Sequence, residues 1–295
     1  MKTVVIGRTG QLAHALARLD PSAAVLDRSQ LDLAAPETIG PALERAQPEV
    51  IINAAAYTAV DKAETERERA FAVNATGVGE LARAAADLGA PLIHVSTDYV
   101  YPGGGDRPYR EDDETDPINA YGQSKLAGEL AALSVQPQTV ILRTAWVYAP
   151  WGHNFVRTML RLASARDHLR VVHDQRGQPT SALDLARACL LAAQKAAGSS
   201  ADDAVWGVTH YAGADETSWA EFAETIFSKA AGRLIERAPV VERISTAEYP
   251  TPAARPANST LDLARFTHVF GQAPRPLSEA LDEVLTMIRP EDVAE

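Results

Sequence analysis

The sequence predicts an α/β fold, in which a doubly wound parallel sheet is followed by a smaller α/β domain at the C-terminal end. Two observations carry this prediction. Short apolar segments alternate with segments of helical periodicity over the first half of the chain, which is typical of a parallel sheet covered by helices. The apolar segments are continuous rather than alternating, as expected of strands that are buried on both faces.

The elements of the first half follow one another in a regular order. Strands are expected at residues 2–7, 23–27, 49–55, 91–98 and 139–148, and helices at 10–20, 75–89 and 120–133. A loop rich in Gly, Asp and Pro, residues 102–117, precedes the last of these helices.

The pattern of expected strands and helices changes after Val147. Amphipathic helices are expected at 154–165, 181–196 and 218–232, and a strand at 169–174. Residues 240–258 are rich in proline and show little periodicity. We therefore expect residues 1–147 to form a Rossmann-type NAD(P)-binding domain, to which residues 175–205 or so return, and residues 148–295 mainly to bind the substrate.

Composition restricts the possible partners. The formal net charge of −11 argues against binding to nucleic acid or to an anionic membrane. A single cysteine, Cys189, excludes a disulfide framework, and its apolar surroundings predict a buried, inert thiol. No apolar run is long enough to cross a bilayer, so a cytoplasmic location is expected.

A glycine-rich turn joins the first strand to the first helix. It runs from Gly7 to Ala13 with the spacing G-x-x-G-x-x-A and includes Thr9, Gly10, Gln11 and Leu12. Glycines allow a tight turn and let backbone N–H groups approach a pyrophosphate at the start of a helix. A plain strand-to-helix turn is the alternative, but the strand before and the helix after favour a dinucleotide site.

Residues at the ends of the next two strands fit the same ligand. Asp27 lies about 20 residues after the turn, where a carboxylate binds the adenosine ribose, and Arg28 beside it suits a 2′-phosphate. Asp32 and Leu33 could flank the adenine or belong to an ordinary loop. Ala54, Ala55 and Ala56 leave room for a flat ligand or for tight packing. Both NADH and NADPH are therefore expected to bind.

A tyrosine and a lysine are placed to act together. Tyr121 and Lys125 lie one turn apart on one face of the expected helix 120–133. A cation nearby lowers the pKa of a phenol from about 10, which makes it a usable general acid. The same spacing also occurs in surface helices without function. Ser96, Thr97 and Asp98 end the fourth strand, at the sheet edge where ligands of parallel sheets bind.

The chain resembles the extended short-chain dehydrogenase/reductases, and among them the dTDP-4-dehydrorhamnose reductases. The resemblance covers most of its length and is carried by GRTGQLA, NAAAYTAVDKAE, FAVNATG, HVSTDYVYPG, YGQSKLAGE, RTAWVY, NFVRTMLRLA, DQRGQPT and YPTPAARPANS. It implies that a nicotinamide gives hydride to C4 of a keto sugar attached to dTDP, that Tyr121 supplies the proton, that Lys125 stabilises the phenolate, and that Thr97 donates a hydrogen bond to the same oxygen.

The resemblance also implies further binding residues. Tyr57 and Asn74 would join the cofactor site, and Thr58, Val60, Tyr99, Trp146, Asn154 and Arg255 would bind the substrate. Five of these have ordinary alternatives: core packing for Trp146, a helix N-cap for Asn154, packing beside Tyr101 for Tyr99, and a plain loop for Thr58 and Val60.

The sequence departs from the family at two places. Ala13 replaces the third glycine of the turn, and His14-Ala15 follows where the family's magnesium-linked dimers have a carboxylate. We therefore expect no metal site and either a monomer or a dimer without a metal link. Two other functions stay open: a related nucleotide-sugar reductase or epimerase, and a non-catalytic subunit resembling the regulatory subunit of methionine adenosyltransferase. The intact Thr97, Tyr121 and Lys125 favour an enzyme.

Overall fold

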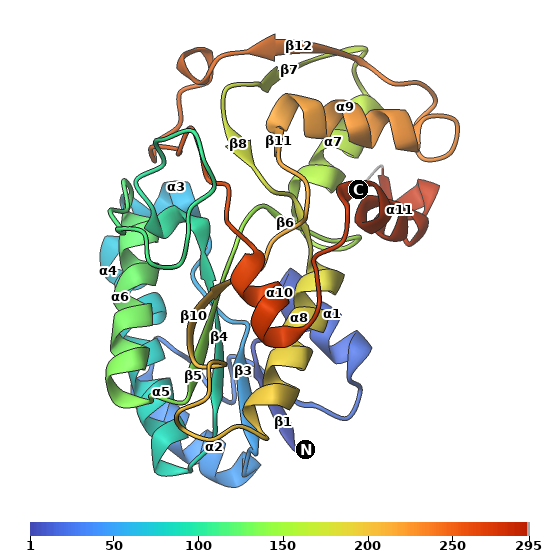
Figure 1. Ribbon diagram of the computed structural model, residues 1–295. Helices are drawn as coiled ribbons and strands as arrows, with labels where there is room; N and C mark the ends of the chain where they lie inside the picture. Colours follow the sequence, from blue (N-terminus) through green and yellow to red (C-terminus); the bar gives the residue numbers. More distant parts are fainter. Residues whose placement is uncertain (294–295) are drawn as a thin grey trace.

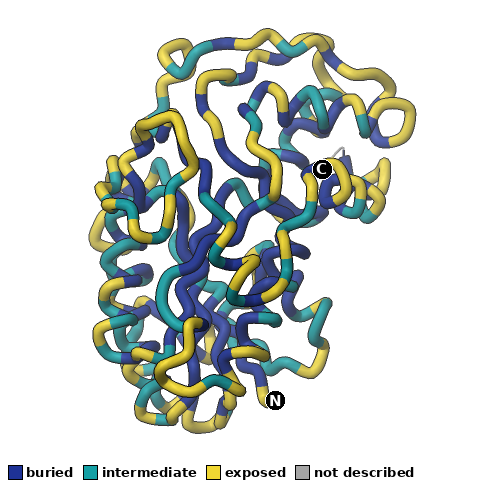
Figure 2. Tube along the Cα trace, in the orientation of Figure 1, coloured by how far each residue is buried: buried dark blue, intermediate teal, exposed yellow. Residues whose placement is uncertain are grey.

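A six-stranded parallel sheet forms the centre of the computed structural model, which describes residues 1–293. Its strand order is β10-β5-β4-β3-β1-β2. The strands are β1 (Thr3–Ile6), β2 (Ala24–Leu26), β3 (Val50–Asn53), β4 (Leu92–Thr97), β5 (Thr139–Thr144) and β10 (Gly207–His210). All residues of β1, β3 and β5 are buried, so the predicted parallel sheet with two covered faces is confirmed (Figure 2).

Helices cover the two faces of this sheet (Figure 1). One face packs on α1 (Gln11–Leu19) and α8 (Ala182–Ala196), and the other on α2 (Ile39–Ala46), α5 (Gly77–Asp87) and α6 (Ala120–Val135). Successive strand residues point to opposite faces: Val5 belongs to the first core, whereas Val4 and Ile6 belong to the second. The continuous apolar runs of the sequence therefore fill two separate cores.

The chain changes direction between β1 and β3. From β1 it moves outward to β2, and then returns to the other side of β1 to form β3, β4, β5 and β10 in turn. Ligands of such sheets bind beyond the carboxyl ends of the strands at this switch point. The glycine turn after β1 and the alanines after β3 both lie there.

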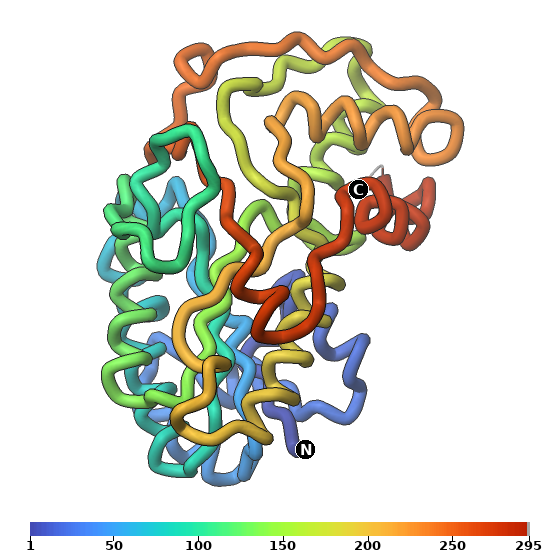
Figure 3. Tube along the Cα trace, viewed as in Figure 1, coloured from blue at the N-terminus to red at the C-terminus, as the bar shows by residue number. Residues whose placement is uncertain are grey.

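The second half of the chain forms smaller sheets and helices above the carboxyl edge of the large sheet (Figures 1 and 3). Parallel strands β7 (His168–Val172) and β12 (Val240–Ile244) lie with α7 (Phe155–Ala163) and α9 (Trp219–Ala230). Short pairs join β6 (Val147–Tyr148) to β9 (Thr180–Ser181) and β8 (Arg176–Gly177) to β11 (Thr217–Ser218). Residues 182–210 return to the large sheet as α8 and β10, and the division into domains at Val147 stays a prediction.

The other elements are short or lie near the C-terminal end. They are η1 (Pro36–Thr38), α3 (Val60–Ala63), α4 (Arg67–Phe71), the π-helix η2 (Ala72–Thr76), η3 (Asp98–Val100), η4 (Thr246–Glu248), α10 (Ala264–Phe270), α11 (Leu277–Thr286) and η5 (Pro290–Val293). Within residues 1–293, no helix is both long and apolar enough to span a membrane.

One expectation about the elements was wrong. The strand expected over 139–148 is divided into β5 and β6, because Trp146 adopts a left-handed backbone with φ of 45°. The region 240–258, which is rich in proline and shows little periodicity, begins with β12. This strand pairs with β7, but it exposes Val240, Glu242 and Arg243, so no apolar pattern marks it.

Candidate active site

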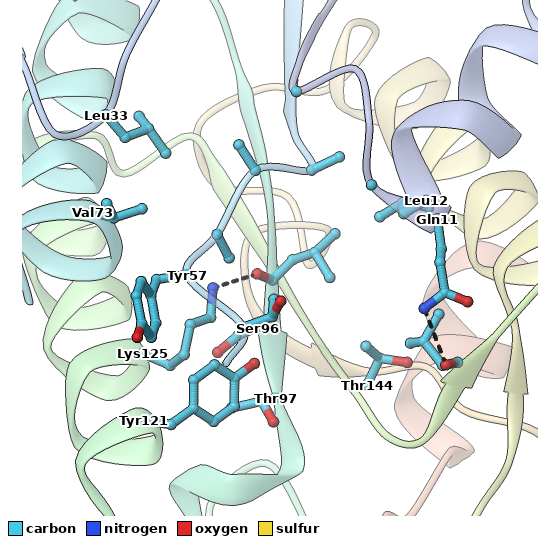
Figure 4. A pocket seen from close by; sticks show the side chains of 18 of the residues that line it. Gln11, Leu12, Leu33, Tyr57, Val73, Ser96, Thr97, Tyr121, Lys125 and Thr144 are labelled. Carbon is cyan, nitrogen blue, oxygen red and sulfur yellow. Dashed lines mark hydrogen bonds between the residues drawn. The ribbon is translucent and has the colours of Figure 1, made fainter. Parts of the chain in front are cut away.

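A cavity of about 900 Å³ runs along the carboxyl ends of β1, β3, β4 and β5. It begins at the glycine turn and reaches the start of α6 (Figure 4). Twenty of the predicted site residues line it: Gly7, Thr9, Gly10, Gln11, Leu12, Asp27, Arg28, Asp32, Leu33, Ala54, Ala55, Ala56, Tyr57, Thr58, Val60, Thr97, Tyr99, Tyr121, Lys125 and Trp146. The structure therefore brings both predicted halves of the site into one space.

The glycine turn leaves room for a phosphate at the N-terminus of α1. Gly7 has a φ of 103°, and a Cβ there would lie 3.3 Å from Ala55. A Cβ at Gly10 would meet no atom within 4 Å, and no side chain caps the helix. Unpaired N–H groups and the helix dipole attract an anion at such a terminus. Ala13 is buried, so the missing glycine does not obstruct the turn.

Charged groups surround the end of β2. Ser29 donates to the Asp27 carboxylate from its backbone N–H and its hydroxyl, and these bonds lower the pKa of Asp27. Arg8 lies 3.6 Å from the same carboxylate, and Arg28 donates to Asp32 over 2.9 Å. Arg69 also lines the cavity. Sequence reasoning missed Arg8 and Arg69, although Arg8 lies inside the recognised motif.

Four buried hydrogen-bonding atoms of cavity-lining residues have no partner among the described residues. They are Gln11 Oε1, Ser96 Oγ, Asp98 Oδ2 and Thr144 Oγ1. Buried polar atoms of proteins are nearly always paired, so each is suited to a polar ligand. Together with the open turn, they fit a nicotinamide dinucleotide lying along the strand ends.

Close backbone packing brings Tyr121 to the end of β4. Asn119 caps α6 by accepting from the Gly122 N–H over 2.8 Å. A Cβ at Gly122 would lie 2.1 Å from the Tyr99 carbonyl oxygen, so glycine is required for this approach. Thr97 ends β4, donates to Asp98 over 2.9 Å and accepts from the Tyr99 N–H. Thr97 and Tyr121 thus face the same end of the cavity (Figure 4).

Lys125 is almost wholly buried, with 1% of its surface exposed. Its Nζ donates to the Val95 carbonyl over 2.7 Å and lies 3.2 Å from His94 Nε2. Burial lowers the pKa of Lys125 to about 8. His94 is thus a buried neighbour of this amine.

The expectation that Lys125 lowers the pKa of Tyr121 was wrong for this structure. Burial raises the pKa of Tyr121 to about 12, a hydrogen bond with Thr97 opposes that rise, and the Asp98 charge adds to it. Loss of water around the phenol outweighs any cation, because the lysine is itself desolvated and bonded elsewhere. Tyr121 therefore keeps its proton at neutral pH.

Two predicted residues lie outside the cavity lining. Asn74, within the π-helix, accepts from the Tyr57 N–H and donates to the Tyr57 carbonyl and to Ser124. It therefore fixes the loop after β3 to α6. Asn154 caps α7 by accepting from the Arg157 N–H, which is the alternative considered from the sequence. Direct ligand contacts for both stay predictions.

Arg255 also lies outside the cavity lining and already has a partner. Its guanidinium donates to Asp61 over 2.8 Å and to the Ala253 carbonyl over 3.3 Å. The side chain is 17% exposed. The Asp61 carboxylate thus holds this arginine in place. A phosphate that contacted Arg255 would have to share its guanidinium group with Asp61.

Trp146 lies against a tryptophan that sequence reasoning missed. Its ring stacks on Trp219 with 3.5 Å between centroids and 6° between planes, and both rings line the cavity. Trp219 is the first residue of α9, more than 70 positions along the chain. Nothing in its local sequence distinguishes it from a core aromatic residue.

The residues that follow the glycine turn do not belong to a metal site within residues 1–293. Ala15 is fully buried, and His14 stacks on Trp151 with 4.2 Å between ring centroids. In residues 1–293, no three or more His, Cys, Asp or Glu side chains gather as a metal site. Independence from magnesium stays a prediction.

Comparison with known proteins gives one consistent family. The model of the RmlD substrate binding domain matches residues 1–289. A dTDP-4-dehydrorhamnose reductase of Sinorhizobium fredii is 49% identical over 277 residues, which cover 92% of each protein. The crystal structure of a Clostridium acetobutylicum dTDP-4-dehydrorhamnose reductase is 35% identical, with a TM-score of 0.89, over 97% of this chain and 99% of that one. The Bacillus anthracis enzyme in complex with NADP is 34% identical, with a TM-score of 0.88 and the same coverage.

Proposed function

The chain belongs to the dTDP-4-dehydrorhamnose reductase family, and we propose that it uses NAD(P)H to reduce the C4 keto group of dTDP-4-dehydro-6-deoxy-L-mannose to dTDP-L-rhamnose. One observation carries the proposal beyond the family. A single cavity connects the glycine turn to Thr97, Tyr121 and Lys125. A dinucleotide and a carbonyl substrate therefore have room to meet beside a proton donor.

The bound nicotinamide supplies a hydride, and the residues of the chain supply binding, orientation and the proton. The turn at Gly7 and Gly10 holds the pyrophosphate, and the charged groups around Asp27 hold the adenosine ribose. The Thr97 hydroxyl, which donates to Asp98 in the free protein, turns to donate a hydrogen bond to the carbonyl oxygen of the sugar. Tyr121 keeps its proton until that oxygen gains negative charge, and then donates it. Lys125, one turn away, stabilises the phenolate that remains.

We propose that Thr58, Val60, Tyr99 and Trp146, all of which line the cavity, form its substrate end, where Trp219 stacks on Trp146. Asn154 and Arg255 are assigned to the substrate by family resemblance. We further propose that the protein works in the cytoplasm, binds no nucleic acid, and is a monomer or a dimer without a metal link. The net charge of −11 supports the proposal that the protein binds no nucleic acid.

The experiment compares Tyr121→Phe with the wild-type protein. Removing the phenol hydroxyl should lower kcat by about 10²- to 10⁴-fold, with dinucleotide affinity nearly unchanged. Tyr148→Phe is a matched control, because the buried Tyr148 hydroxyl has no partner within residues 1–293 and does not line the cavity. Turnover of Tyr121→Phe within a few-fold of wild type would remove the tyrosine from the mechanism.

The alternatives are separated by substrate. Purified protein is incubated with NADPH or NADH and with several nucleotide keto sugars, and products are identified by mass. Reduction of a different sugar nucleotide would support the related reductase or epimerase. Absence of turnover with every sugar would support the non-catalytic subunit.

A further inference from the structure

A fully buried histidine touches the amine of Lys125 without lining the cavity. His94 lies on β4 with no exposed surface, and both its ring nitrogens have partners. Nδ1 lies 3.0 Å from the Asn53 amide nitrogen, and Nε2 lies 3.2 Å from Lys125 Nζ. Asn53, also buried, ends β3 beside it. The three side chains form a continuous line behind the cavity wall.

The direction of the first hydrogen bond is fixed by the backbone. Asn53 Oδ1 accepts from the Ala55 N–H over 3.1 Å, so the amide nitrogen must face His94. That nitrogen can only donate, and His94 Nδ1 must therefore accept. A neutral imidazole has one proton, which is consequently on Nε2 and directed at Lys125.

His94 is neutral across the working range of pH. Burial and the charge of Lys125 hold the pKa of His94 well below its usual value. An ammonium group has donors but no acceptor, so a charged Lys125 would oppose the Nε2–H group. An uncharged amine can instead accept from it through its lone pair. The contact is therefore favourable when the Lys125 amine is uncharged and unfavourable when it is an ammonium group.

We propose that His94, oriented by Asn53, is a positioning residue that favours the uncharged amine of Lys125 and thereby sets the pH range over which the enzyme works. The inference rests on the proposed role of Lys125 in the reduction. It adds two residues that do not touch the cavity, and it explains why a histidine is placed behind the reactive amine.

The other titratable or charged groups near Lys125 do not account for a preference for its uncharged amine. On its own helix, Tyr121 lies one turn before it, and Glu129 lies one turn after it. The Glu129 charge raises the proton affinity of the lysine, but Glu129 is paired with Arg143 of β5 over 2.6 Å. Asp98, at the start of η3, lies near Tyr121, and the Val95 carbonyl of β4 accepts from the lysine in either charge state. Tyr57, after β3, is bonded to Glu66.

The consequence for catalysis concerns the alkaline side of the pH profile. Lys125 stabilises a phenolate only as an ammonium group, so kcat should fall as the pH rises through its pKa of about 8. Without the opposing Nε2–H group, the ammonium should persist to higher pH. The histidine therefore acts on kcat through the lysine, without contact with the sugar.

The test measures the protonation of Lys125 directly. The chain has five lysines, Lys2, Lys62, Lys125, Lys195 and Lys229, so the NMR signals of ¹³Cε-labelled lysine can be followed individually during a pH titration. Lys125→Met assigns the signal. Asn53→Asp reverses the tautomer, because a carboxylate accepts from Nδ1–H and leaves Nε2 as an acceptor for the ammonium. His94→Gln offers an amide oxygen to the ammonium without adding charge. His210→Gln, at another fully buried histidine, is the matched control.

In the free wild-type protein, the Lys125 signal should titrate below those of the other lysines. Asn53→Asp and His94→Gln should each raise its midpoint by about 1 to 3 pH units, and His210→Gln should not. If either Asn53→Asp or His94→Gln does not fold, the titration of the other variant tests the proposal. A midpoint that is unchanged or lower in a folded variant overturns the proposal. A raised midpoint also overturns the proposal if kcat of the variant still falls over the same alkaline pH range as kcat of the wild-type protein. The NMR titration requires no substrate, so it holds even if the sugar reduction proves wrong.

Discussion

Gly177→Ala is expected to disturb the substrate end of the cavity, although Gly177 does not line it. A Cβ at this position would lie 2.3 Å from Trp146 Cε2 and 2.6 Å from its Cζ2 and Nε1 atoms. The indole also stacks closely on Trp219, which restricts its movement. Trp146 also has a left-handed backbone, which persists only where packing enforces it.

The expected magnitude follows from overpacking. Forcing a methyl group into a filled space costs about 1–3 kcal/mol, through displaced side chains or backbone. Each kcal/mol lowers Tm by roughly 2–4 °C in a protein of this size class. We therefore expect Tm to fall by about 2–12 °C. Because Trp146 must move, KM for the sugar nucleotide should rise while the affinity for NADPH stays nearly constant.

Thermal unfolding, near-ultraviolet circular dichroism of the tryptophan pair and steady-state kinetics measure these effects. Gly40→Ala is the control, because Gly40 lies in α2 with nothing within 4 Å of its Cβ and should be neutral or stabilising. Adding Trp146→Phe should restore part of the lost stability by removing the crowded atoms. A Gly177→Ala protein with wild-type Tm and KM would refute the argument.

Three further predictions concern ligands. Arg28→Ala should raise KM for NADPH but not for NADH, because Arg28 lies where the 2′-phosphate is expected, and an equal effect on both cofactors would contradict this role. Arg255→Ala should raise KM for the sugar nucleotide about 10- to 150-fold with kcat little changed, as expected of a lost charge-assisted contact with the diphosphate; an unchanged KM would leave Arg255 with the Asp61 ion pair alone. Activity should survive EDTA, and a loss that Mg²⁺ reverses would show a metal requirement.

The residues that the sequence assigns to the cofactor lie together along one cavity because their positions are determined locally. Gly7 and Gly10 lie in one turn, and Asp27 follows at the end of the next strand, so spacing along the chain is enough to place them. Tyr121 and Lys125 are placed equally well by the helix period. The parallel sheet is predictable for the same reason, since each buried strand is a single apolar run.

The rest depends on contacts between distant segments. Trp219 reaches the cavity because β11 pairs with β8, and no local pattern indicates that pairing. The pKa of Tyr121 could not be predicted from its spacing to Lys125, because burial by the surrounding structure dominates it. His94 contacts Lys125 across the gap between a strand and a helix, and Asn53 reaches it from the neighbouring strand.

The two ends of the cavity therefore depend on different parts of the fold. The residues assigned to the dinucleotide lie in loops that follow strands of the large sheet, which is buried on both faces. At the substrate end, Trp146 is held by Trp219 and by the close approach of Gly177, both from the second half of the chain. Perturbations that loosen this second half should weaken binding of the sugar nucleotide before that of the dinucleotide. Selectivity for the sugar can thus change by substitutions in the second half, while the sheet and the proton donor stay as they are.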